Sequence, residues 1–282
     1  MNNKLSELRK KPHWSFSSLN GILNICSLQW AFKYVYKKEP ESTPINLIFG
    51  SAFHRVAEWI AACRMENEYP KAEEVKDAFS ESWLWHVRNS DKLSLSDDEF
   101  SQFNATGQRM IECLNREWTE TNIVEVNKSF SVKIPGASKP LIGEIDLIVK
   151  DPKNRTILVD WKTAAKKWGV SKADKDLQAT CFMFAYQRII PDYKAENNLF
   201  RYDVVTKTKE PSYTQYCTLR NEDDFLRLSK LIRIIEKAVN AEAFLPNEQG
   251  FYCTGCQFAS ACKEWHRQQA KTISLPTSQV AA

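Results

Sequence analysis

Two short segments on either side of one turn constrain the fold of this chain more than any other feature. Residues 141–150 and 155–162 alternate apolar and polar side chains, and Asp151-Pro152-Lys153-Asn154 lies between them. A period of two predicts β-strands, and the proline and asparagine predict a turn. We therefore expect the two segments to pair as an antiparallel hairpin.

The register of this hairpin decides which side chains meet. If the hairpin is symmetric about Lys153, Asp146 lies opposite Asp160 and Glu144 lies opposite Lys162. These four polar side chains then share one face, because side chains alternate along a strand. The other face is expected to be core and carries Ile145, Leu147, Val149, Val159 and Trp161.

Two facing carboxylates beside a lysine suggest a site for a divalent cation. Opposed carboxylates repel each other, so a sheet selected only for stability would avoid the pair. A bound Mg²⁺ or Mn²⁺ makes the carboxylate pair favourable, because hard cations prefer oxygen ligands. Such a cation also polarises phosphoryl oxygens and activates water. Lys162 would orient this water and stabilise developing negative charge. The alternative is an exposed hairpin face with an ordinary Asp–Lys ion pair, which contributes about 0–1 kcal/mol.

Two more polar residues fit such a site. Gly50-Ser51-Ala52-Phe53-His54 opens a predicted helix that continues through Met65, and imidazole is a ligand for Mn²⁺. Glu58 lies one turn after His54 and can brace its ring or reach a ligand. Gln178 lies in a predicted helix over 173–189, directly after the second strand. A lone helical histidine is more often structural, so the match to the hairpin matters more than the histidine itself.

In their order, these segments resemble the motifs G-x-x-x-H, G-x-x-D, (D/E)-x-K and Q-x-x-x-Y of the RecB-type branch of the PD-(D/E)XK nuclease superfamily. The matching residues are Gly50 with His54, Gly143 with Asp146, Asp160-Trp161-Lys162, and Gln178. The fourth motif departs from the pattern, because Phe182 stands at its aromatic position and Tyr186 follows a turn later. The resemblance implies metal ligands at His54, Asp146, Asp160 and the Trp161 carbonyl. It implies catalytic roles for Asp146, Asp160, Lys162 and Gln178.

The cysteines give an independent signal. The array Cys253-Thr-Gly-Cys256-Gln-Phe-Ala-Ser-Ala-Cys262 supplies three thiols, one short of a tetrahedral set, and Cys26 is the best fourth. The other four cysteines lie in apolar-patterned segments and are predicted to be buried core thiols: Cys63, Cys113, Cys181 and Cys217. The N-terminal residues form no apolar signal sequence, and no apolar run is long enough to span a membrane. A cytoplasmic location with reduced thiols is therefore expected.

One early cysteine and three late ones resemble the iron–sulfur subgroup of RecB-type nucleases, which includes AddB-type subunits, CRISPR-adaptation nucleases and phage exonucleases. The segment from Ser15 through Cys26 to Tyr34 also resembles that subgroup, although Ser27 replaces its usual proline. The resemblance implies a [4Fe–4S] cluster that joins the two ends of the domain. Zinc is the rival, since C-x2-C serves both metals, and a disulfide ranks last. A four-thiolate zinc site can contribute ~10–16 kcal/mol of apparent binding energy, so either cluster can decide whether the ends fold.

The resemblance implies an α/β (α+β) fold with a restriction-endonuclease-like core of a mixed sheet flanked by helices. We expect one domain over 1–270, with a helical insertion at about 66–120, a cysteine-rich region at 250–265 and a disordered tail at 271–282. Further strands are predicted at 123–134, 198–206 and 213–218. Further helices are predicted at 17–36, 45–66, within 71–118, and at 222–241.

A net charge of +4 and a pI near 8.5 permit nucleic-acid binding without requiring it. Basic residues follow directly on the proposed active strand, where they would attract a phosphate backbone, and a tryptophan among them could stack on an unpaired base. The residues are Lys166, Lys167, Trp168, Lys172 and Lys175. For any single lysine, a solvated loop is an equal alternative.

Three functions remain open on this basis. The first is a cation-dependent DNA exonuclease that acts on single-stranded or end-containing DNA in recombination, repair or phage DNA metabolism. The second is a CRISPR-adaptation nuclease that trims spacer precursors beside a protein partner. The third is a non-catalytic DNA-binding module with an iron–sulfur or zinc site, whose acidic residues only hold the sheet together.

Overall fold

The computed structural model describes residues 5–191 and 197–272. At its centre is a five-stranded sheet in the order β1-β2-β3-β4-β5. β3 and β4 are parallel, and the other neighbouring strands are antiparallel. The strands are β1 (Ile123–Val132), β2 (Leu141–Lys150), β3 (Thr156–Ala164), β4 (Asn198–Thr206) and β5 (Tyr213–Thr218).

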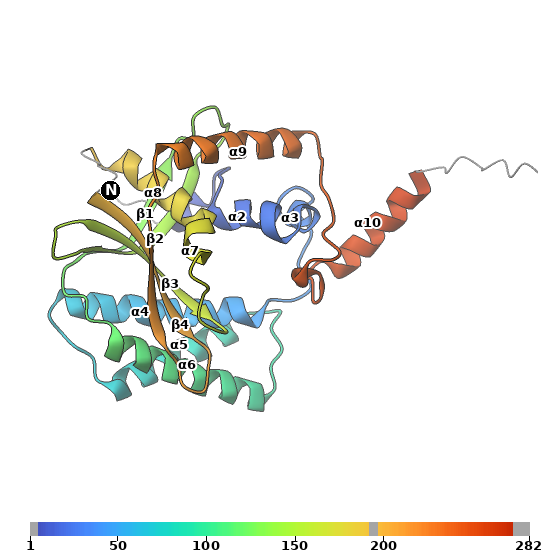
Figure 1. Ribbon diagram of the computed structural model, residues 1–282. Helices are drawn as coiled ribbons and strands as arrows, with labels where there is room; N and C mark the ends of the chain where they lie inside the picture. Colours follow the sequence, from blue (N-terminus) through green and yellow to red (C-terminus); the bar gives the residue numbers. More distant parts are fainter. Residues whose placement is uncertain (1–4, 192–196, 273–282) are drawn as a thin grey trace, which may run out of the picture. The chain divides into compact units, whose positions relative to one another are not determined.

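Helices cover both faces of this sheet (Figure 1). One face packs against α4 (Ile45–Met65) and α6 (Asp97–Glu117), and α5 (Ala72–Arg88) packs on these two helices. The other face packs against α8 (Leu177–Ile189), and α9 (Glu222–Asn240) contacts α8 through Phe225 and Phe184. The predicted mixed α/β core with helices on its faces is confirmed, and α5 and α6 occupy the predicted helical insertion. The shorter elements are α1 (Leu5–Leu8), α2 (Phe16–Asn20), the π-helix η1 (Gly21–Ile25), α3 (Ser27–Tyr34), α7 (Lys172–Lys175), the 3₁₀-helix η3 (Phe251–Cys253), and α10 (Ala259–Thr272).

The predicted hairpin forms in the predicted register. Leu147 pairs with Val159 and Lys150 pairs with Thr156, which is the pairing that symmetry about Lys153 requires. Asn154 closes the turn with φ of 60°, a left-handed conformation that asparagine tolerates better than most residues.

Four of the five residues predicted for the apolar face of the hairpin share one core cluster. Leu147, Val149, Val159 and Trp161 are fully buried and belong to the cluster formed with the apolar side of α4, α5 and α6. Ile145 is also fully buried, but it lies outside this cluster. Burial of each such side chain contributes about 1.5–3 kcal/mol. The side chain of Asp160 lies on the opposite face of β3 and meets α8 through Gln178.

Two predicted helices are interrupted. The helix expected over 17–36 consists of α2, η1 and α3, and Cys26 between them is extended with φ of −168°. There the Cys26 thiol accepts the backbone N–H of Gln29 and caps α3. The helix expected over 173–189 breaks at Asp176, whose carboxylate caps α8 through the backbone N–H of Gln178. In both cases a side chain competes successfully for the backbone donor that would continue the helix.

The chain divides into two compact units. The sheet unit comprises Met1–Phe16 and Thr43–Lys237, and the cysteine unit comprises Ser17–Ser42 and Ala238–Ala282. Within the cysteine unit, the early and late segments are joined by backbone bonds, such as that from Leu28 N–H to the Leu245 carbonyl. Residues 273–282, most of the tail predicted to be disordered, lie outside the described residues.

The prediction of four buried core thiols is half right. Cys113 and Cys181 are buried, but Cys63 is only partly buried and Cys217 is exposed. Cys217 lies on β5, where the side chains alternate between exposed and partly buried positions, and it occupies an exposed one. In the described ranges 5–191 and 197–272, no helix combines the length and apolarity needed to cross a membrane.

Candidate active site

β2 and β3 separate at the carboxylates that were predicted to face each other. The recorded pairing runs from Lys150 with Thr156 to Leu147 with Val159 and stops one residue short of Asp146 and Asp160. Beyond this point a side chain takes part in the bonding between the strands, because Asp146 Oδ2 accepts the backbone N–H of Trp161 at 3.0 Å. The two carboxylates therefore lie at the fork of the hairpin, where the strands leave room between them.

His54 reaches the same fork from α4. Its Nδ1 lies 3.3 Å from Asp146 Oδ2, and its ring meets the indole of Trp161 edge-on at 6.3 Å. The neighbouring backbone of Trp161 makes a small contribution that raises the pKa of His54. Asp146 of β2 thus contacts both His54 of α4 and the backbone of Trp161 in β3.

Asp160 is the most deeply buried member of the site, with 4 % of its side chain exposed. Lys162 Nζ lies 2.5 Å from its Oδ2, and the Gln178 side-chain amide donates to its Oδ1. All the predicted catalytic residues therefore converge on one face at the fork, as the alternation of side chains predicted.

The charge states follow from burial and neighbours. Burial raises the pKa of Asp146 well above its usual range and the Asp160 carboxylate raises it further, whereas Lys162 opposes both effects. Burial lowers the pKa of His54 more than Asp160 raises it, so the imidazole is neutral at pH 7 and able to donate a lone pair. Burial alone would lower the pKa of Lys162, but Asp160 and Asp146 raise it, so the ammonium stays charged. The site therefore combines two crowded carboxylates with a permanent cation.

Comparison with known proteins identifies the family of this chain. The sequence profile described as "PD-(D/E)XK nuclease superfamily" matches residues 13–263. The chain belongs to the PD-(D/E)XK nuclease superfamily. No curated protein is similar enough in sequence to give a match.

Two solved structures are similar to this chain. A protein from Eubacterium rectale described as a "Putative exonuclease" is 13 % identical with a TM-score of 0.51, and the match covers 89 % of this chain and 90 % of that one. A protein named SSO0001 is 12 % identical with a TM-score of 0.35, and the match covers 92 % of this chain and 96 % of that one. At these identities the first likeness supports the fold, and the second carries no further weight.

Gly143, which resembles the glycine of the RecB-type G-x-x-D motif, has a packing role here. Gly143 pairs with Phe130 across β1 and β2, and a Cβ at Gly143 would lie 2.5 Å from Cζ of that ring. The Phe130 ring meets Phe182 edge-on at 5.4 Å, and Phe182 lies one turn after Gln178 on α8. The missing side chain of Gly143 thus lets the β1 ring support the helix that carries Gln178.

Phe182 accounts for the departure of the fourth motif. Its ring is nearly buried among Phe130 and Phe200, a setting that suits phenylalanine better than tyrosine. Burial raises the pKa of Tyr186, while a hydrogen bond with Thr156 lowers it, which places that hydroxyl at the start of β3. The Tyr186 hydroxyl therefore joins α8 to the start of β3 and takes no part in the fork.

Sequence reasoning missed the residues that hold Gln178 in place. Tyr202 pairs with Asp160 across the parallel strands, and its hydroxyl accepts the backbone N–H of Ala179 at 3.2 Å. Arg220 is buried and donates to the backbone carbonyls of Ala173, Asp174 and Asp176, each at 3.0 Å. These contacts fix the α7–α8 turn, and no carboxylate among the described residues pairs with the guanidinium. No local pattern signals them, because they join segments far apart in sequence.

The residues of the fork fit a divalent cation. Gln178 Oε1 is buried without a hydrogen-bond partner among the described residues, and a bound cation or its water would satisfy this oxygen. Burial, and then the neighbouring Asp160 carboxylate, raise the pKa of Asp146, and a bound cation would oppose both effects. Glu58 lies close enough to raise the pKa of both His54 and Asp146, which fits the role in bracing the ring or reaching a ligand.

The side chains of the fork are nevertheless not arranged as a complete set of metal ligands. Within 5–191 and 197–272, no group of three or more His, Cys, Asp and Glu side chains is already placed to hold a metal ion. At the fork, His54 contacts Asp146, and Lys162 and Gln178 contact Asp160. These internal contacts would have to yield in part to a cation.

The predicted DNA-binding residues lie on the loop after β3 and on α7. Trp168 packs on Tyr202 and Tyr216 with centroid distances of 4.9 and 5.7 Å, and Lys172 Nζ lies 4.1 Å above its ring. Trp168 thus anchors the loop on the sheet. Lys166, Lys167 and Lys175 are exposed on either side of it.

The four cysteines predicted to bind a cluster all belong to the cysteine unit. The side-chain amide of Gln29 donates to Cys256 Sγ at 3.5 Å, and its backbone N–H donates to Cys26 Sγ at 3.4 Å. Burial raises the pKa of Cys262, and Cys256, Cys26 and Cys253 raise it further. Gly255 takes φ of +76° between Cys253 and Cys256, a conformation that favours glycine in a tight turn. The four thiols thus lie within electrostatic reach of one another, although they do not yet form a ligand sphere.

Proposed function

We propose that the protein is a divalent-cation-dependent deoxyribonuclease that hydrolyses phosphodiester bonds in single-stranded or end-containing DNA. The observation that carries the proposal is the convergence of His54, Asp146, Asp160, Lys162 and Gln178 at one fork. Membership of a nuclease superfamily supports a nucleic-acid substrate. The preference for DNA ends rests on the resemblance to RecB-type nucleases and on the described activity of the Eubacterium rectale protein.

In this proposal each residue has a defined task. His54, Asp146, Asp160 and the Trp161 carbonyl would hold Mg²⁺ or Mn²⁺, which supplies Lewis-acid polarisation of the phosphate and a more acidic bound water. Lys162 keeps its charge, orients the attacking water and stabilises negative charge on the phosphoryl oxygens. Gln178 holds the Asp160 carboxylate in one orientation. Trp161, packed in the core, fixes β3 between Asp160 and Lys162.

The test is cleavage of linear and circular single-stranded DNA of the same sequence with Mg²⁺ or Mn²⁺. The wild type should degrade linear DNA and spare circles, while Asp160→Ala should degrade neither. Asp91→Ala is the matched control, because Asp91 is an exposed carboxylate outside the fork. Degradation of circular DNA by the wild type as well would show that the protein is an endonuclease and not an exonuclease. Cleavage retained by Asp160→Ala would refute the site, and binding without cleavage by the wild type would favour a non-catalytic DNA-binding module.

We further propose that Cys26, Cys253, Cys256 and Cys262 bind a structural [4Fe–4S] cluster in a reducing, cytoplasmic environment, with zinc as the alternative. The mutual effect of these thiols on the pKa of Cys262 supports a shared site. Hydrolysis needs no electron, so a cluster here would stabilise the packing of the two segments of the cysteine unit.

Iron, sulfide and zinc content after anaerobic purification tests this assignment. Cys256→Ser should lose the metal and unfold at a lower temperature, whereas Cys217→Ser, an exposed thiol of the sheet unit, should keep both. One zinc per chain without iron or sulfide would select the zinc site. Equal metal content in the wild type and Cys256→Ser would refute both.

A further inference from the structure

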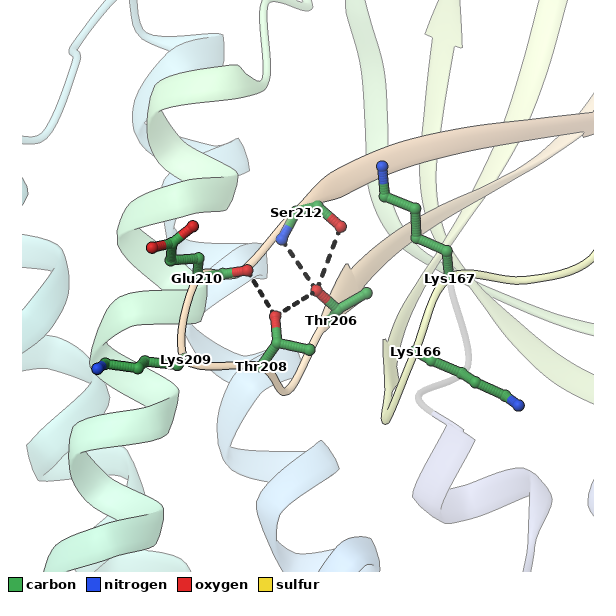
Figure 2. Close-up of a pocket in the computed structure, with 7 residues that line it drawn as sticks. All are labelled: Lys166, Lys167, Thr206, Thr208, Lys209, Glu210 and Ser212. Carbon is green, nitrogen blue, oxygen red and sulfur yellow. Dashed lines mark hydrogen bonds between the residues drawn. The ribbon is translucent and has the colours of Figure 1, made fainter.

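A pocket of about 500 Å³ lies where β3 and β4 end (Figure 2). One wall is the loop after β3, with Lys166 and Lys167, and the other is the β4–β5 connection, with Thr206, Thr208, Lys209, Glu210 and Ser212. Parallel strands end at the same edge of a sheet, and the backbone N–H of Lys207 donates to the Ala164 carbonyl at 2.7 Å. The two walls are thus held together by the strands that carry the catalytic residues.

A hydroxyl network fixes the β4–β5 wall. Thr206 Oγ1 accepts the backbone N–H of Ser212 at 2.9 Å and lies 3.2 Å from Ser212 Oγ. It also lies 3.1 Å from Thr208 Oγ1, which donates to the Glu210 carbonyl at 2.5 Å (Figure 2). The connection is therefore organised before any ligand arrives, which lowers the entropic cost of binding.

The pocket is lined by more positive than negative side chains. No ion pair involves Lys166, Lys167 or Lys209 in the described part of the chain, and Glu210 supplies the one carboxylate of the lining. Lys207 differs, because its ammonium donates to Asn46 Oδ1 at 2.7 Å and lies 4.6 Å above Phe49. Three lysines against one glutamate leave a net charge of +2 on the lining.

The direction of the lysines indicates what shape of anion fits. In Figure 2 the ammonium groups of Lys166, Lys167 and Lys209 point in three different directions around the pocket, and do not converge on one point. A single small anion would gain from converging donors. An extended polyanion gains from charges spread along its path.

The pocket is also close to the fork. Lys162 and Lys166 are separated by four residues, which span at most about 14 Å of extended chain. A strand cleaved at the fork would therefore have neighbouring phosphates within reach of these lysines. Trp168, packed on Tyr202 and Tyr216, limits the movement of the loop that carries Lys166 and Lys167.

We propose that this pocket binds the sugar–phosphate backbone of a single DNA strand beside the bond that is cleaved, with the β4–β5 connection as its second wall. This proposal deepens the proposed nuclease function and rests on it for the identity of the strand. Lys167 and Lys209 attract phosphates from opposite walls, and Glu210 opposes them. Removing a lysine should weaken binding, and removing the Glu210 charge should strengthen it.

The test is equilibrium binding of a fluorescent linear single-stranded oligonucleotide to the full-length protein, in chelator so that binding is measured without cleavage. The affinity of the Lys167→Gln, Lys209→Gln double variant should fall several-fold. Its slope of log affinity against log salt should become shallower by about 0.7 for each phosphate that the variant no longer neutralises. Glu210→Gln should raise the affinity. Lys153→Gln is the control, because this exposed lysine lies in the turn before β3, at the other end of that strand.

Each outcome separates this proposal from the proposed function. Pocket variants that bind with the affinity and salt slope of Lys153→Gln would overturn the pocket, even if the wild type cleaves DNA with Mg²⁺ or Mn²⁺. If the pocket variants have a shallower salt slope than a wild type that does not cleave DNA, the DNA-binding pocket would be supported and the proposed nuclease function would be refuted. Absence of any binding by the wild type would overturn the pocket outright.

Discussion

Substitution of the G-x-x-D glycine by alanine tests how the sheet supports the active site. A Cβ at Gly143 would lie 2.5 Å from Cζ and 2.9 Å from Cε1 of Phe130. Carbon atoms in good contact lie about 3.5–4.0 Å apart, so the ring must retreat by about 1 Å. Phe130 is 3 % exposed and meets Phe182 at 5.4 Å, so the ring moves only by displacing α8.

The expected cost of Gly143→Ala follows from this crowding. Overpacking of a buried site costs about 1–3 kcal/mol, and the upper half of that range applies because both neighbours are buried aromatic rings. For a domain of this size, each kcal/mol lowers the melting temperature by about 2–4 °C. Cleavage should fall along with stability, because Phe182 and Gln178 share one helix.

The assay is urea unfolding combined with DNA cleavage, arranged as a double-mutant cycle with Phe130→Leu. The smaller side chain leaves room for the new methyl group, so the double variant should be more stable than the sum of the single effects by about 1–2 kcal/mol. Gly50→Ala is the matched control, because a Cβ at this helical glycine meets nothing within 4 Å. It should stabilise α4 by about 0.5–1 kcal/mol. A neutral Gly143→Ala, or strictly additive effects with Phe130→Leu, would refute the packing argument.

Three further predictions follow from individual contacts. Lys162→Ala should abolish cleavage while DNA affinity stays within a few-fold, since the residue acts on the reacting phosphate; near-normal turnover would remove it from the mechanism. Arg220→Met should cost about 3 kcal/mol or more in urea unfolding, because it strips buried carbonyls of their donor, and amide exchange over 173–180 should accelerate; unchanged exchange there would contradict its role in placing Gln178. Burial alone would raise the pKa of Glu236, but hydrogen bonds from Trp14 and Ser138 lower it below its usual value. The ionised Glu236 carboxylate therefore stabilises the fold at pH values above its pKa in the unfolded chain, and this stability is lost as the pH falls through its pKa in the folded protein. Glu236→Gln should reduce the loss of unfolding free energy between neutral and acid pH. An unchanged pH dependence of the unfolding free energy would contradict this role.

The hairpin was predictable because its information is local. Alternation of apolar and polar residues and the turn at Lys153 set the register, and the register alone brings Asp146 and Asp160 to the same place. The limits of β4 and β5 followed from the same alternation and agree with the structure. The helices over 17–36 and 173–189 were predicted too long, because the caps supplied by Cys26 and Asp176 depend on side-chain conformation and not on periodicity.

By itself, the sequence determined the two-residue rhythm of the central strands, the identity of the polar groups at the fork and the superfamily to which they point. Only the tertiary structure decided how these groups are held. The fork opens because the Asp146 carboxylate takes a backbone donor from the neighbouring strand, and Gln178 is aimed by Tyr202, Arg220 and the Phe130–Phe182 contact. The same is true of the basic pocket, whose walls come from the ends of two parallel strands. Local patterns follow from the geometry of one strand or helix, whereas contacts between distant segments exist only after the chain has packed.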